Sequence, residues 1–136
     1  MTKKLLIIIP FLTISVAHGQ SEAKAIRAMF DKQLVAANSG DLKGYMATID
    51  PATPSYAPTE KAMGTIFQSY KLKFSLESFK VTSIQAKSAT VATIMVTKKI
   101  SGPKFKDNRI KMTMTAVKKG GKWLLSGTKL EKIDYL

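Results

Sequence analysis

The spacing of the apolar residues changes at residue 71, and this change constrains the fold more than any other feature of the chain. Before residue 71, apolar residues recur at intervals of three and four, which is typical of amphipathic helices. After it, apolar and polar residues alternate, which is typical of strands. Helices followed by consecutive antiparallel strands predict an α+β fold in which the helices pack on one face of the sheet.

Three helices are predicted in the N-terminal half. We expect Ser21 to cap the first, which ends at the glycine of "NSG". Asp41 is expected to cap a short second helix, and the following "DP" pair stops it because a residue before proline avoids helical angles. Pro58 or Thr59 is expected to open the third helix. All three helices carry an apolar stripe, so we expect them to cover the concave face of the sheet.

Four strands are predicted in the C-terminal half. The first begins at residue 71 and changes phase near Glu77 or Ser78, which predicts a β-bulge there. The other strands are expected at residues 90–100, 109–116 and 122–133. Gly120 and Gly121 supply the positive φ angles of a tight hairpin between the last two. The sheet is therefore predicted to be a bent antiparallel meander.

The N-terminus has the three parts of a secretory signal peptide. "MTKK" is positively charged, a twelve-residue apolar stretch follows, and "AHG" offers small residues for cleavage. We predict a leader over residues 1–19, cleaved after Gly19 or alternatively after Ala17, and one domain over residues 20–136. An uncleaved membrane anchor is less favoured, because the stretch is shorter than the ~20 residues a bilayer requires and Pro10 interrupts it. The predicted location is the periplasm or the outside of the cell.

Histidine and cysteine are almost absent, which excludes much enzyme chemistry. The chain has no cysteine, and its one histidine, His18, lies in the predicted leader. The domain therefore lacks the usual nucleophile and base pairs and the preferred ligands of zinc, copper and haem. The acidic residues are scattered singly, and no phosphate-loop spacing is present. We expect no metal and no cofactor.

The chain is strongly basic, with 22 Lys and Arg, nine Asp and Glu, and a net charge of +13. Most of the surplus lies in the last two hairpins, in two groups at opposite ends of the third strand. Only Arg27 and Arg109 could make the bidentate contacts favoured by specific nucleic-acid readers, so no specific nucleic-acid binding is predicted. The lysines of "KKGGK" are expected to keep the hairpin tip solvated, while Trp123 and Leu125 face one layer of the fold.

Two segments carry a resemblance to a known superfamily. The segment "AANSGDLKGYMATIDP" after the long first helix and the final "KKGGKWLLSGTKLEKI" resemble the nuclear-transport-factor-2-like superfamily, also called SnoaL-like or ketosteroid-isomerase-like, as an exported bacterial member. The resemblance implies a cone-shaped fold, with three N-terminal helices on a strongly bent antiparallel sheet, an apolar pocket, and often a homodimer through the sheet. It does not imply one activity, because the superfamily includes enzymes and binding proteins.

Seven residues are the predicted lining of that pocket: Tyr45, Tyr56, Met63, Met95, Met112, Met114 and Trp123. The alternative is that these residues form an ordinary core without a ligand. Asp50 is the one catalytic candidate, because the isomerases of the superfamily use a pocket aspartate as general base. Its alternative is the turn-forming role of an aspartate before proline.

The sequence thus predicts an exported, non-catalytic domain that binds a small apolar ligand or a protein partner through the pocket or a sheet face. The first alternative is a cofactor-independent isomerase, dehydratase or cyclase acting on a small hydrophobic substrate. The second is electrostatic binding to anionic envelope polymers or lipids.

Overall fold

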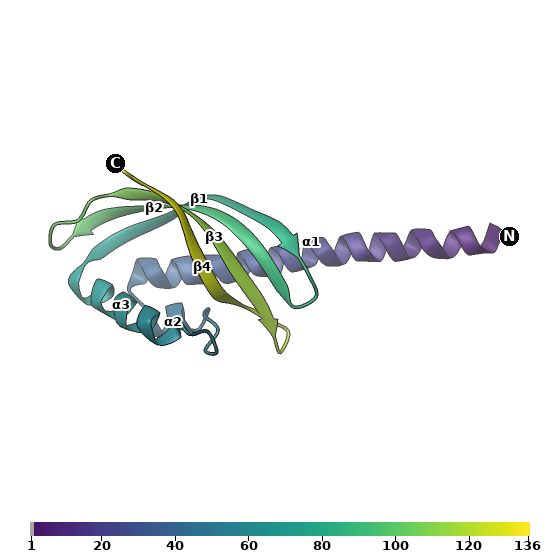
Figure 1. The fold of residues 1–136 in the computed structure, drawn as a ribbon, viewed down its shortest axis with the longest axis horizontal. Coiled ribbons are helices and arrows are strands. Elements are labelled where there is room, and N and C mark those ends of the chain that lie inside the picture. The colour runs from purple at the N-terminus through teal and green to yellow at the C-terminus, as the bar shows by residue number, and fades with distance from the viewer. Residues whose placement is uncertain (1) are drawn as a thin grey trace.

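The computed structural model describes the backbone of residues 2–136 and the side chains from residue 18 onward. Its elements are α1 (Thr2–Ser39), α2 (Leu42–Met46), α3 (Tyr56–Ser69), β1 (Lys71–Ile84), β2 (Ser88–Ser101), β3 (Asn108–Lys119) and β4 (Lys122–Tyr135). The strands form one antiparallel sheet in the order β1-β2-β3-β4. The sheet curves over the C-terminal part of α1, with α2 and α3 on the same side (Figure 1). The predicted α+β class is confirmed.

Helix α1 begins at Thr2, so the prediction that Ser21 caps this helix is wrong. Residues around Ser21 include no proline, and a lone Gly19 costs only about 1 kcal/mol within a helix, so nothing stops the helix there. The predicted cleavage points fall within α1, and the side chains of the apolar leader stretch lie outside the described residues. Among the helical residues that the structure describes, no stretch is long and apolar enough to span a bilayer.

The two shorter helices begin where local capping chemistry allows. Asp41 caps α2 as predicted, since its carboxylate Oδ1 accepts a hydrogen bond of 3.0 Å from the Gly44 amide. Helix α2 ends at Met46, before the predicted "DP" stop. Helix α3 begins at Tyr56 rather than at Pro58 or Thr59. Pro58 then lies in the first turn of the helix. A backbone N–H in the first turn has no intrahelical acceptor, so the lack of one in proline costs no helical hydrogen bond.

The details of the meander follow the local sequence. The β1–β2 register shifts between Leu76 and Ser78, which confirms the predicted bulge. Gly120 and Gly121 adopt φ angles of 56° and 74°, as a tight β3–β4 hairpin requires. The strands are two to three residues longer than predicted at several ends, because the alternation weakens there while the ladder pairing continues.

The core lies between α1 and the concave face of the sheet. Its buried members are three residues of α1 and six of β2, β3 and β4: Ile26, Met29, Phe30, Ala89, Val91, Met114, Ala116, Trp123 and Leu125. Trp123 and Leu125 face this core together, whereas Lys122 is exposed, as the alternation predicted. The hairpin that carries the tryptophan is therefore part of the main core.

Candidate functional site

An apolar cavity of about 280 Å³ lies between the helices and the concave face of the sheet. Its large apolar side chains come from α1, α3, β1, β2 and β3 and include Phe30, Leu34, Met63, Phe74, Leu76, Met95, Met112 and Met114. The polar side chains of Gln33, Tyr45 and Thr97 also reach it. Among the described residues, no charged side chain lines this cavity. The space therefore suits an uncharged and largely apolar molecule.

The structure brings five of the seven predicted lining residues together. Tyr45 and four methionines line the cavity; the methionines are Met63, Met95, Met112 and Met114. Tyr56 and Trp123 are absent from this lining. Tyr56 is the half-buried first residue of α3, and Trp123 is buried beside Glu22 on α1. Whether the five gathered residues bind a ligand stays a prediction.

Sequence reasoning missed several lining residues, although their signals were present. Phe30 and Leu34 belong to the apolar stripe of α1, and Phe74 and Leu76 to the alternation of β1. Those patterns predict that a side chain is buried, but a buried side chain can face either solid core or a cavity. The distinction depends on how far the helices stand from the sheet, which no local pattern reports.

The polar groups of the cavity are held in place by neighbours. Gln33 donates from Nε2 to Thr48 Oγ1 at 2.9 Å, and this hydroxyl donates to the Tyr45 carbonyl at 2.6 Å. The Tyr45 ring packs edge-on against Phe67 with centroids 6.0 Å apart. Burial raises the pKa of the Tyr45 phenol, so the phenol stays neutral at physiological pH. The lining thus presents a few fixed polar atoms in an otherwise apolar wall.

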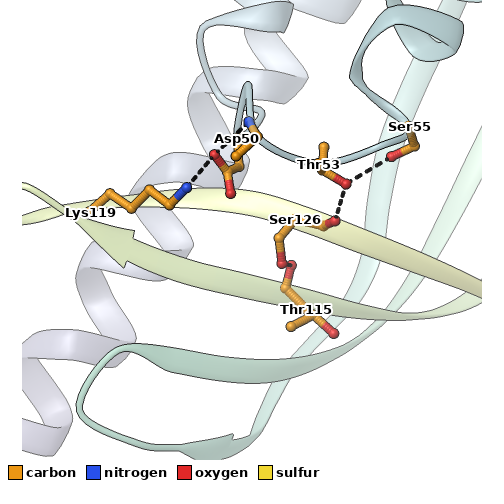
Figure 2. Close-up of polar contacts among 7 residues, drawn as sticks. Asp50, Thr53, Ser55, Thr115, Lys119 and Ser126 are labelled. Atoms are coloured by element: carbon orange, nitrogen blue, oxygen red, sulfur yellow. Dashed lines mark hydrogen bonds and ion pairs between the residues drawn. The ribbon is translucent and has the colours of Figure 1, made fainter.

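Asp50 lies outside the lining and joins the loop after α2 to the last hairpin (Figure 2). Its Oδ1 accepts hydrogen bonds from Lys119 Nζ at 2.9 Å and from the Ala52 amide at 3.0 Å. The bond from Lys119, and after it the bond from Ala52, lower the pKa of the Asp50 carboxyl. A general base works best with a pKa near the working pH, and the Asp50 pKa is shifted in the opposite direction. The arrangement suits a structural link.

Two lysines of the hairpin tip form ion pairs with nearly buried carboxylates. Lys118 Nζ lies 3.0 Å from both carboxylate oxygens of Glu22, and Trp123 Nε1 donates to Glu22 Oε2 at 3.1 Å. Lys119 pairs with Asp50 as described. The expectation that the tip lysines only keep the hairpin solvated is therefore wrong for Lys118 and Lys119. Lys118 lies opposite Trp123 in the β3–β4 ladder, so both side chains point toward α1.

A comparison with protein families identifies the group to which this chain is related. The family model described as anti-sigma-I factor RsgI9, C-terminal domain, matches residues 28–136. The chain belongs to the RsgI9 C-terminal domain family. The RsgI9 anti-sigma-I factor of Acetivibrio thermocellus is 31% identical over 78 residues, which are 57% of this chain and 11% of that protein. The chain thus spans about a tenth of the length of the curated relative it matches.

Solved structures similar to this RsgI9-type domain share its fold at low sequence identity. A candidate scytalone dehydratase from Novosphingobium aromaticivorans has a TM-score of 0.72 at 12% identity, over 88% of this chain and 90% of that chain. A protein of the NTF2-like family from Streptomyces avermitilis has a TM-score of 0.68 at 13% identity, over 81% and 94%. The nuclear-transport-factor-2-like resemblance is therefore confirmed for the fold alone.

The two hairpin ion pairs predict how the stability of this RsgI9-type domain depends on pH. Lys118 lowers the pKa of Glu22 and Lys119 lowers that of Asp50, relative to unfolded values of about 4.3 and 3.9. A lowered pKa in the folded state stabilises the fold above the unfolded pKa, and the stabilisation is lost as the pH falls below about 4. We expect the midpoint temperature of thermal unfolding to decrease as the pH is lowered from about 5 to about 3.

The control for this prediction is the double variant Glu22→Gln with Asp50→Asn. Neither amide titrates, so its unfolding midpoint should be lower than that of the parent at pH 6 but should change less between pH 5 and pH 3. Calorimetry over this range measures both slopes. Equal slopes for parent and variant would show that other carboxylates govern acid unfolding.

Proposed function

We propose that this domain is a non-catalytic recognition module that acts outside the cytoplasm and binds a small, uncharged, largely apolar molecule in the cavity. The observation that carries this proposal is the lining itself, which among the described residues is apolar or neutral throughout. Burying a charged ligand group in such surroundings without a partner is costly, whereas an apolar ligand gains from the burial. The location is supported by the predicted signal peptide.

The size and composition of the cavity narrow the class of ligand. Ligand pockets typically measure about 300–1,000 Å³, and this cavity lies at the lower end of that range. Four of its wall residues are methionines, whose unbranched side chains adapt to different shapes. The phenol of Tyr45 can meet one polar atom of the ligand. A compound of one or two rings, or a short branched chain with one hydroxyl or carbonyl group, fits these features.

The family relationship supports a sensing role. The curated relative is an anti-sigma-I factor, and the matching region is described as its C-terminal domain. A regulator of this kind requires an input, and a domain that changes its stability when a ligand fills its cavity can provide one. We propose that the present domain performs the recognition step of such a task.

The absence of acid–base groups from the lining supports the non-catalytic part of the proposal. Among the described residues, the cavity wall includes no carboxylate, imidazole or amine, and Asp50 is engaged with Lys119 outside it. No cluster of acidic residues, histidines or cysteines suited to a metal ion occurs in the described part of the chain either. Proton transfer in the cavity would depend on the neutral Tyr45 phenol alone.

A fluorescence titration with N-phenyl-1-naphthylamine tests the proposal, because this uncharged compound, a phenyl group joined through nitrogen to a naphthalene, emits more strongly in apolar surroundings. The parent should show saturable binding. Met63→Trp, which adds bulk to the cavity wall, should weaken binding at least about tenfold, the effect of losing roughly 1.4 kcal/mol of binding free energy. Excitation outside tryptophan absorption keeps the readout specific to the compound.

The matched control is Val35→Trp, which places the same ring on an α1 residue that is 69% exposed and outside the lining. This variant should bind as the parent does, and thermal unfolding of both variants checks that they fold. Equal weakening by the two substitutions, or no saturable binding by the parent, would contradict the proposal.

A further inference from the structure

The outer edge of β4 is covered along only half of its length. Near the hairpin, the Asp50 amide donates to the Leu125 carbonyl and the Leu125 amide to the Thr48 carbonyl, both at 2.8 Å. Thr53 Oγ1 then donates to the Ser126 carbonyl at 2.8 Å (Figure 2). Beyond Ser126, β4 is the terminal strand of the sheet, and no described strand pairs with its outer edge. Residues 128–135 thus present backbone groups that could pair with a further strand.

The uncovered half of β4 also exposes large apolar side chains. Leu130, Ile133 and Tyr135 are 57%, 37% and 61% exposed. Leu130 pairs with Met112 and Ile133 with Ile110, two residues that line the cavity. Paired residues in an antiparallel ladder point to the same side, so the exposed side chains continue the concave face. The apolar face of the sheet therefore extends past the point where the helices cover it.

The charged residues of this segment alternate in sign on the other face. Lys129, Glu131, Lys132 and Asp134 are the four charged residues between Thr128 and Tyr135. The β3–β4 register shifts between Leu130 and Lys132, which inserts one extra residue, and Thr113 donates to Glu131 Oε1 at 3.0 Å. The shift keeps Leu130 and Ile133 on one face although they are three residues apart. Glu131 and Lys132 consequently share the convex face.

We propose that two copies of this chain pair antiparallel through residues 128–135 of β4, about a twofold axis between Glu131 and Lys132. The opposed pairs are then Thr128 with Tyr135, Lys129 with Asp134, Leu130 with Ile133, and Glu131 with Lys132. The two residues of a pair come from different copies, and each pair occurs twice because of the twofold symmetry. All four charges of each strand meet an opposite charge, Leu130 meets Ile133, and the Tyr135 ring lies beside the small Thr128 side chain.

Neighbouring registers lack this match. A shift by one residue places Glu131 opposite Glu131 of the second copy, or Lys132 opposite Lys132 of the second copy. Like charges directly opposed across two strands are destabilising, so the sequence of the edge selects one register. Twofold pairing of this kind is isologous and closes on itself, which prevents open-ended addition of further copies.

The convex face is a poorer surface for a second copy. Its exposed or half-exposed basic residues come from all four strands: Lys73, Lys80, Lys98, Arg109, Lys111, Lys129 and Lys132. Packing this face on itself brings these positive charges together with fewer acids to offset them. The edge pairing keeps the face solvated and still forms a dimer through the sheet.

The edge pairing also affects the cavity. Thr128 lines the cavity and is the β4 residue opposed to Tyr135 of the second copy. The second copy therefore contributes an aromatic side chain beside the wall formed by β4. The edge pairing does not depend on ligand binding.

Two variants of opposite sign test the proposal. Lys129→Glu with Lys132→Glu makes all four edge charges negative, and Glu131→Lys with Asp134→Lys makes them all positive. Each variant alone should lose the dimer that the parent forms, because every opposed pair becomes repulsive. Mixed in equal amounts, they should form a heterodimer, because every pair becomes attractive again. Analytical ultracentrifugation of the purified full-length protein measures the masses.

The matched control is Lys73→Glu with Lys80→Glu, which lowers the net charge by as much as Lys129→Glu with Lys132→Glu, but on the far strand β1, and should leave the dimer intact. A parent that stays monomeric at high micromolar concentration would overturn the proposal. Dimers that persist in both single-sign variants, or a mixture that fails to form the heterodimer, would overturn it as well.

Discussion

Replacing Trp123 by alanine should lower the stability of the domain more than any other single substitution in the last hairpin. Trp123 is 3% exposed, packs in the core with α1, and donates its indole N–H to Glu22. Truncating a buried tryptophan typically costs about 3–5 kcal/mol, and here the carboxylate of Glu22 also loses a hydrogen-bond donor. We expect the unfolding midpoint to fall by roughly 10–25 °C.

Two companion variants separate packing from polarity. Trp123→Phe keeps much of the buried ring and loses the indole N–H, so it should be destabilised less than the alanine variant. Lys122 directly precedes Trp123 in the strand but is exposed, so Lys122→Ala should shift the free energy of unfolding by no more than about 0.5 kcal/mol. Chemical denaturation followed by circular dichroism measures all three. An alanine variant as stable as the parent would show that the hairpin is not part of the core.

Ile26→Ala should have the second largest effect. Ile26 is completely buried in the cluster between α1 and the sheet. Removing its side chain beyond Cβ leaves a void that rigid neighbours fill only partly, and such changes typically cost about 2–5 kcal/mol. Val35→Ala on the same helix is the matched control, because Val35 is largely exposed and should change the stability little.

This prediction also bears on the start of the folded unit. The family match begins at residue 28, whereas Ile26 and Glu22 on α1 contact the core and the hairpin before that point. A leader cleaved at Gly19 leaves both residues in the mature domain. Equal stability of Ile26→Ala and Val35→Ala would show instead that the first part of α1 contributes little to the fold.

Features that depend on local chemistry were predicted correctly from the sequence. Asp41 caps α2 because an aspartate side chain reaches the amide three residues on, and Gly120 with Gly121 permits the positive φ angles of the hairpin. The bulge after Leu76 follows from a change in the phase of the apolar residues. In each case the residues that decide the structure are neighbours in the chain.

Features that depend on distant segments could not be predicted. Lys118 and Glu22 are 96 residues apart in the sequence, and Lys119 and Asp50 are 69 apart, so no local pattern pairs them. Tyr56 was expected in the cavity, but its place depends on where α3 begins and how the helix lies over the sheet. The four lining methionines were found because strand alternation and helical spacing happen to point them inward.

The methionine methyl groups offer the most direct measurement of the central claim that a small neutral ligand occupies the cavity. Met63, Met95, Met112 and Met114 line it, whereas Met29 and Met46 are buried outside its lining and act as internal controls. In a titration of methyl-labelled protein with N-phenyl-1-naphthylamine followed by NMR, the signals of the four lining methionines should shift and saturate together while the two controls stay in place. Shifts confined to Met29 or Met46, or no shifts at all, would contradict the account.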